Sequence, residues 1–153
     1  MRTVCVWLAA AGFVATAALH FLSFTPWAAL PGERAVWALG APVFVLAAVM
    51  VVRLRSMAAL GRRWGRVAVH DWRALVRAVP PGLQLLVVGA ALYAWMNFVL
   101  CLLLEPAALP QVAITLRMAS GHLIFFFLVP LVFFRWVDGA HYADPALAKP
   151  LRP

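Results

Sequence analysis

Charged residues are scarce in this chain, and acidic residues are the scarcest. Only 12% of the 153 residues are charged, with 13 Lys or Arg against 5 Asp or Glu, whereas 66% are hydrophobic. A soluble domain of this length cannot cover so much apolar side chain, which excludes a water-soluble globular protein. The excess predicts a chain embedded in lipid hydrocarbon, with no room for a separate soluble enzyme domain.

Common catalytic and metal-binding motifs are also missing. The two cysteines, Cys5 and Cys101, stand far apart and form no CxxC pair, and no P-loop, HExxH or glycine-rich dinucleotide turn occurs. The formal net charge of +8 comes without a nucleic-acid recognition motif, so nucleic acid is not an expected partner. Neither a catalytic residue nor a metal site is predicted.

What the chain does contain is four long apolar runs, each long enough to cross about 30 Å of hydrocarbon as a helix. They are expected at residues 4–24, 35–52, 83–104 and 118–134. The fold class predicted from them is an all-α, integral membrane four-helix bundle in a single domain, followed by a short disordered tail at 138–153.

The start of the first run allows a second interpretation. Arg2 precedes an apolar core, and Ala15-Thr16-Ala17 resembles the cleavage site of a signal peptide. However, the apolar run continues unbroken to Phe24, which favours a membrane span.

Arginines crowd the segment between the second and third runs. Basic residues resist translocation, so the side of the membrane with more of them is expected to be cytoplasmic. Four alternating spans then place both termini inside (N-in, C-in) and predict a bacterial inner-membrane protein. Only Arg34 and Arg117 would lie outside; the inside set is Arg2, Arg53, Arg55, Arg62, Arg63, Arg66, Arg73, Arg77, Arg135, Lys149 and Arg152.

The arginine-rich segment 53–82 also has helical order. At 100° per residue most of its arginines share one side, opposite Leu60, Trp64 and Val67. This pattern predicts an interfacial amphipathic helix between the second and third spans that contacts anionic lipid headgroups or an acidic cytoplasmic partner. The contacting side chains would be Arg55, Arg62, Arg63, Arg66, Arg73 and Arg77.

Polar side chains inside the runs gather toward the expected outer leaflet. Such residues are costly in hydrocarbon and mark the protein-facing side of a helix. One set recurs every four residues in the first run and another in the third run, and the rest lie near the start of the fourth. Together they predict an outward-facing polar pocket made of His20, Thr16, Tyr93, Asn97, Glu105, Arg117, Ser120 and His122.

Several functions use this set of residues. The sequence favours an accessory or binding subunit without an autonomous catalytic centre, in which these side chains also bridge the helices. One alternative is a redox subunit that carries haem b between His20 and His122, with Arg117 or Arg34 pairing with the propionates. Quinone or lipid-headgroup binding, and proton or small-solute transport, would use the same side chains. Asp138, His141 and Asp144 are expected to be solvated on the tail.

Overall fold

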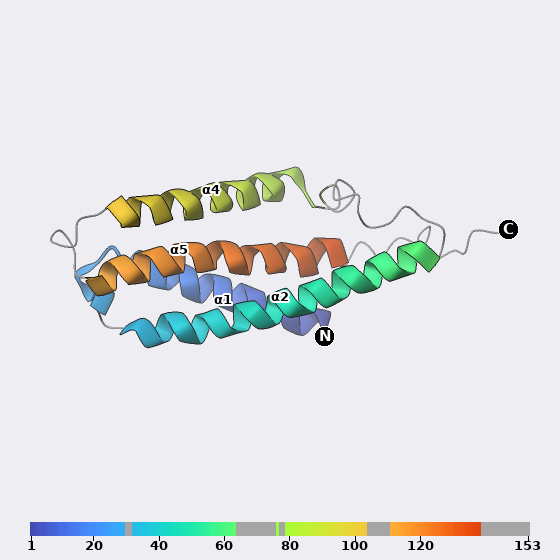
Figure 1. Cartoon of the computed structure of the whole chain (residues 1–153), viewed down its shortest axis with the longest axis horizontal. Helices are drawn as coiled ribbons and strands as arrows, with labels where there is room; N and C mark the ends of the chain where they lie inside the picture. Colours follow the sequence, from blue (N-terminus) through green and yellow to red (C-terminus); the bar gives the residue numbers. More distant parts are fainter. Residues whose placement is uncertain (30–31, 64–75, 77–78, 104–110, 139–153) are drawn as a thin grey trace.

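The described part of the chain is almost entirely helical. The computed structural model describes residues 1–29, 32–63, 76, 79–103 and 111–138, and no β-strand occurs among them. The helices are α1 (Arg2–Leu22), α2 (Gly32–Arg63), α4 (Pro81–Leu103) and α5 (Gln111–Val132), with a short 3-10 helix η1 (Pro26–Ala29) after α1 and a π-helical turn η2 (Phe133–Val137) after α5 (Figure 1).

These helices confirm the coarse prediction of an all-α protein with four apolar spans. Within the described residues, the stretches long and apolar enough to cross a membrane are Arg2–Leu22, Arg34–Met57, Pro81–Leu103 and Gln111–Val137. Their lengths match the thickness of a hydrocarbon core. The class of protein compatible with this fold is therefore a multi-pass α-helical membrane protein.

Two helices extend beyond the predicted apolar runs. α2 continues to Arg63 instead of stopping at residue 52, so Arg53 and Arg55 lie on α2 itself and not in a separate interfacial helix. α5 begins at Gln111, a full two turns before Met118. Hydropathy marks only the part of a helix that suits hydrocarbon, and good helix formers such as Arg, Leu and Met continue it further. The rest of the predicted interfacial helix, 64–75 and 77–78, is outside the described residues.

α5 is the common packing partner of the other helices. It packs against α1, α4 and α2, and α1 also contacts α2, whereas α4 packs chiefly against α5 (Figure 1). Close approach of α1 and α5 depends on Gly12, because a Cβ there would collide with the ring of Phe127. The other helices are therefore grouped around α5. In a regular four-helix bundle, by contrast, four equivalent helices surround a common axis.

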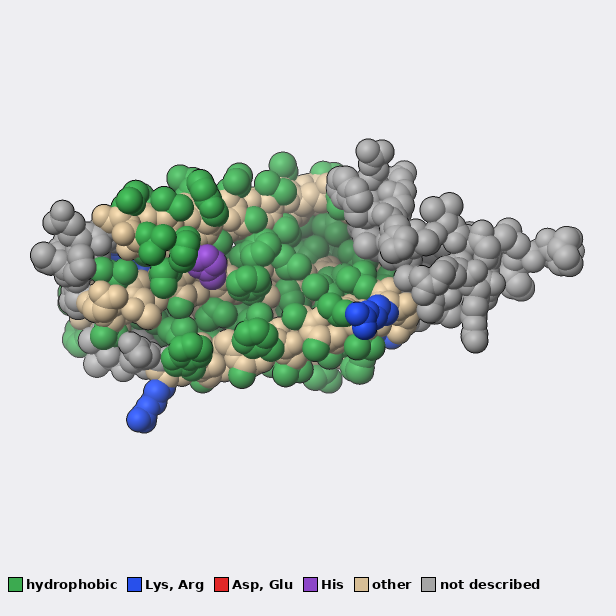
Figure 2. Space-filling model, in the orientation of Figure 1, with side chains coloured by type: hydrophobic (Ala, Val, Ile, Leu, Met, Phe, Trp, Pro, Cys, Tyr) green, Lys and Arg blue, Asp and Glu red, His purple; other side chains and the backbone are tan. Residues whose placement is uncertain are grey.

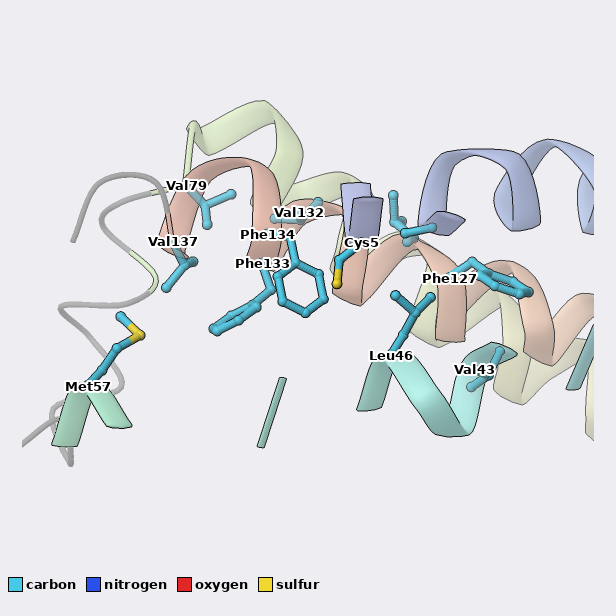
Figure 3. Close-up of a cluster of buried hydrophobic side chains, with 12 residues drawn as sticks. Cys5, Val43, Leu46, Met57, Val79, Phe127, Val132, Phe133, Phe134 and Val137 are labelled. Atoms are coloured by element: carbon cyan, nitrogen blue, oxygen red, sulfur yellow. The ribbon is translucent and has the colours of Figure 1, made fainter. Parts of the chain in front are cut away.

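The apolar core lies along α5 toward the end where the chain begins. Figure 3 shows Phe127, Phe133 and Phe134 from α5 and η2 packed with Cys5 of α1 and Leu46 of α2. Phe127 is fully buried, so this cluster has the close packing of a protein interior.

Much of the outer surface is apolar as well. Trp7, Trp37, Phe44, Leu85 and Leu103 each expose more than two thirds of their surface, and apolar side chains cover most of the face shown in Figure 2. A monomer in water rarely exposes so large an apolar area. Lipid hydrocarbon is the solvent that this surface suits.

Candidate functional site

His20 lies on a buried stripe of α1. Cys5, Ala9, Gly12, Thr16 and His20 are the buried residues of that helix, and residues about four apart share one helix face. The predicted inward orientation of Gly12, Thr16 and His20 is thus what the fold shows. Only 6% of the His20 surface is exposed, although it lies in the last turn of α1.

Both ring nitrogens of His20 are hydrogen-bonded to other helices. Nδ1 lies 2.9 Å from the Ser120 hydroxyl on α5, and Nε2 bonds to the Tyr93 hydroxyl on α4. The Ser120 hydroxyl has one hydrogen, which it donates to the Leu116 carbonyl at 2.5 Å. With its hydrogen used there, Ser120 can accept the Nδ1 hydrogen of His20, which leaves Nε2 to accept the hydrogen of Tyr93. This chain of hydrogen bonds links α4, α1 and α5 through the His20 ring.

Asn97 adds a second connection between α4 and α5. Its Nδ2 donates to the Arg117 carbonyl at 3.0 Å, and the Cys101 thiol lies 3.9 Å from its Oδ1. Gly121 makes this possible, because a Cβ there would collide with Asn97 Nδ2 and lie 3.5 Å from Cε1 of His20. Sequence reasoning gave Gly121 no part in the polar set, and its place in the sequence, between Ser120 and His122, was the one signal that could have found it.

The side chain of Arg117 runs toward the end of α1. Nη2 donates to the Ser23 carbonyl at 3.1 Å, and the guanidinium carbon lies 4.0 Å from the centre of the Phe24 ring. Nε is buried and has no hydrogen-bond partner. The sequence did not point to Ser23 and Phe24, since a carbonyl acceptor and an aromatic face at a helix end carry no distinctive pattern.

Two other predicted pocket residues, Thr16 and His122, form hydrogen bonds within their own helices. Thr16 donates to the Gly12 carbonyl of its own helix at 2.8 Å, and His122 bonds to the Met118 carbonyl at 2.8 Å and packs edge-on against Phe98. Glu105 is outside the described residues. His20, Tyr93, Asn97, Arg117 and Ser120 are therefore the residues that the fold brings together. We call them the outer polar cluster, after the side of the membrane that the sequence predicts for them.

The geometry around the two histidines does not favour haem. Gly12, which would leave room for the macrocycle, is covered by Phe127, and Gly121 is covered by Asn97. Gly89 has no heavy atom within 4 Å of its Cβ position and lies on an exposed part of α4. Axial ligation through His20 would also require breaking its bond to Tyr93 or to Ser120. Haem ligation by His20 and His122 stays a prediction.

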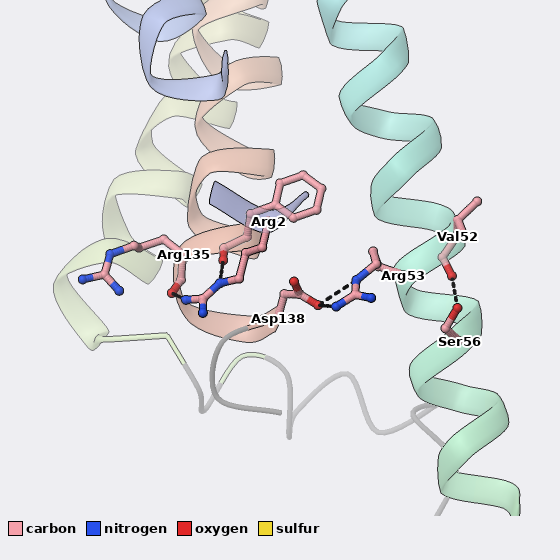
Figure 4. Close-up of polar contacts among 7 residues, drawn as sticks. Arg2, Val52, Arg53, Ser56, Arg135 and Asp138 are labelled. Atoms are coloured by element: carbon pink, nitrogen blue, oxygen red, sulfur yellow. Dashed lines mark hydrogen bonds and ion pairs between the residues drawn. The ribbon is translucent and has the colours of Figure 1, made fainter. Parts of the chain in front are cut away.

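A second set of polar contacts occupies the opposite end of the helices. Arg2 donates to the carbonyls of Phe134 and Arg135 at 2.7 and 2.9 Å, and Arg53 pairs with Asp138 at 2.9 Å (Figure 4). These contacts join the start of α1 and the second half of α2 to η2. We call Arg2, Arg53, Arg135 and Asp138 the inner polar cluster, after the side of the membrane that the sequence predicts for the arginines.

Asp138 corrects a sequence prediction. The carboxylate was expected to be solvated at the start of a disordered tail, but its side chain is fully buried and one of its oxygens, Oδ2, has no hydrogen-bond partner. A buried carboxylate needs a paired cation, and Arg53 on α2 provides it. Residues 139–153 lie outside the described part of the chain.

The predicted arginine surface is described only in part. Arg55 is exposed on α2, two residues after Arg53. The side chains of Arg62 and Arg63 and the residues Arg66, Arg73 and Arg77 lie outside the described residues. Contact of this surface with lipid or with a partner stays a prediction.

No family model, no curated protein and no solved structure matches this chain. Its function therefore has to be inferred from the helices and from the two polar clusters.

Proposed function

We propose that the chain is a multi-pass protein of the bacterial inner membrane, with both termini and the arginine-rich segment 53–82 in the cytoplasm. The contacts of the inner polar cluster support this orientation, because they bring Arg2, Arg53 and Arg135 to one end of the helices. Arg117 belongs to the other end, beside Ser23 at the end of α1. An excess of basic residues at one end is the feature that keeps that end cytoplasmic.

We infer that the protein acts as an accessory or binding subunit without an autonomous catalytic centre. The observation that carries this inference is the hydrogen-bond chain from Tyr93 through His20 to Ser120. Both nitrogens of His20 are engaged with side chains of other spans, so this imidazole connects three helices. Bonds of this kind between helices stabilise a membrane protein by about 1 kcal/mol each. The outer polar cluster thus supports a scaffold better than a reaction centre.

The experiment is purification of the tagged full chain from host membranes in two mild detergents. We expect a colourless protein that brings a larger membrane protein with it at the same ratio in both detergents. An unrelated four-span protein with the same tag is the control for non-specific recovery. Absence of any stoichiometric partner would contradict the accessory role. A Soret band lost in both His20→Ala and His122→Ala would instead assign a haem function.

A further inference from the structure

Arg117 is a cation whose hydrogen-bonding capacity is mostly unused. A guanidinium carries five N–H donors, and the described contacts of the Arg117 side chain use one nitrogen, Nη2, which donates to the Ser23 carbonyl. Nε is buried without a partner, and Nη1 makes no hydrogen bond to the described residues. A carbonyl cannot neutralise the charge, and an unpaired cation at a membrane-embedded position is expensive.

The surroundings of Arg117 indicate which kind of anion would pair with its charge. The guanidinium carbon lies 4.0 Å from the centre of the Phe24 ring, and the donors left over on Nη1 and Nη2 form one fork of the guanidinium. Such a fork matches two oxygens of a phosphate or a carboxylate. Phe24 is 55% exposed beside the guanidinium, and Trp27 in the following helix η1 is 61% exposed. Exposed aromatic rings at the end of a span are typical of the headgroup level of a membrane.

An anionic lipid matches both the unused guanidinium donors and the exposed apolar surface beside them. Its phosphate presents oxygens to the guanidinium edge, while its acyl chains lie against the exposed apolar faces of α1 and α4. A free inorganic anion would gain nothing from those faces. The charge of the group also fits, because the described residues place no carboxylate against Arg117.

We propose that Arg117, held by Ser23 and Phe24, binds the phosphate of an anionic phospholipid at the junction of α1 and α5. This inference rests on the proposed membrane location and names a ligand for the outer polar cluster. It does not depend on the accessory role, because lipid retention and partner recovery are measured separately.

The test is a titration of the purified full chain with phosphatidylglycerol, or with phosphatidylcholine of the same acyl chains, followed by native mass spectrometry. We expect saturable binding of phosphatidylglycerol to the unmodified chain and at least about tenfold weaker binding to Arg117→Gln, because charge-assisted hydrogen bonds are lost. Arg34→Gln, which removes an exposed arginine from the first turns of α2, is the matched control and should bind like the unmodified chain. Equal affinity of the unmodified chain for both lipids, or no effect of Arg117→Gln, would overturn the proposal.

Two further arms keep the test decisive. If Arg117→Gln does not fold, Arg117→Lys retains the charge without the planar fork, and we expect severalfold weaker binding of phosphatidylglycerol. Unchanged binding in Arg117→Lys would count against the site. Inorganic phosphate at the concentration of the lipid should not displace phosphatidylglycerol, and displacement would show a simple anion site without lipid selectivity, which overturns the lipid proposal.

Discussion

At the scale of single residues, the buried Asp138 and the partly buried Arg117 lie at opposite ends of the helices and have different partners. Asp138 is paired directly with Arg53, at 2.9 Å, whereas Arg117 is held by a carbonyl and an aromatic ring. A buried carboxylate without its cation loses several kcal/mol of solvation that nothing replaces. The Arg53–Asp138 pair is therefore a contact on which the junction of α2 with η2 depends.

We predict that Arg53→Gln destabilises the protein by about 3 kcal/mol, the lower end of the range for breaking a buried pair, because the Arg53 side chain is still 24% exposed. The free energy of unfolding is measured by SDS titration in mild detergent micelles. Arg55→Gln, on an exposed position of the same helix, is the control and should change it by less than about 0.5 kcal/mol.

The double variant R53M/D138L separates a pair effect from a general loss of packing. Replacing both charges by apolar side chains removes the buried unpaired charge, so the loss should be smaller than in Arg53→Gln alone. A double variant as unstable as the sum of its two single variants would contradict direct coupling between Arg53 and Asp138.

At the scale of helices, small residues decide which faces can meet. The four-residue spacing in the sequence predicts Gly89, Tyr93, Asn97, Cys101 and Glu105 on one face of the third span. Of those that the structure describes, only Asn97 and Cys101 are buried. A four-residue step overshoots the 3.6-residue turn, so the stripe drifts by about 40° at each step. Gly89 consequently lies away from the contact that Asn97 and Cys101 make.

We predict opposite outcomes for alanine at three helical glycines. Gly12→Ala and Gly121→Ala should each destabilise the protein by about 1–3 kcal/mol, because the new methyl group collides with Phe127 or with Asn97. Gly89→Ala is the matched control. It places the methyl group in open space and should be neutral or stabilise α4 by up to about 1 kcal/mol.

The same SDS titration measures all three glycine variants. For Gly121→Ala, the change should also disturb the Asn97 bond to the Arg117 carbonyl, because the methyl group occupies the place of the amide. Three variants of equal stability would show that α5 does not make these close contacts with α1 and α4.

At the scale of the whole molecule, the described basic residues are unequally divided between the two ends. The inner polar cluster contains three arginines, and Arg55 follows on α2. At the other end, Arg34 lies near the start of α2 and Arg117 lies beside Ser23. This division is what the orientation of the protein in the membrane depends on.

We predict that an impermeant maleimide labels Arg34→Cys, but not Arg55→Cys, in spheroplasts of cells that express a chain with alanine at Cys5 and Cys101. Both positions are exposed on α2 and lie near its two ends. Permeabilisation should make Arg55→Cys reactive, which controls for folding and access. The reverse labelling pattern would contradict the proposed topology.

Part of the outer polar cluster could be predicted from the sequence. Intramembrane polar residues are rare and costly, so His20, Tyr93, Asn97, Arg117 and Ser120 were identifiable as a group from hydropathy and spacing alone. Their bonding could not be predicted, because Ser120 and His122 are both polar and lie only two positions apart near the start of the fourth span. Only the rotation of α5 about its own axis decides which of them meets His20.

The sequence by itself determined the solvent, the number of apolar spans and the expected orientation, because hydropathy and charge are local properties that each segment carries alone. Only the tertiary structure decided that α5 is the shared packing partner, that His20 bonds to Ser120 and that Asp138 is buried against Arg53. The physical reason is distance along the chain. These contacts join residues separated by 100 and 85 positions, and no local pattern states which distant helix face will be opposite.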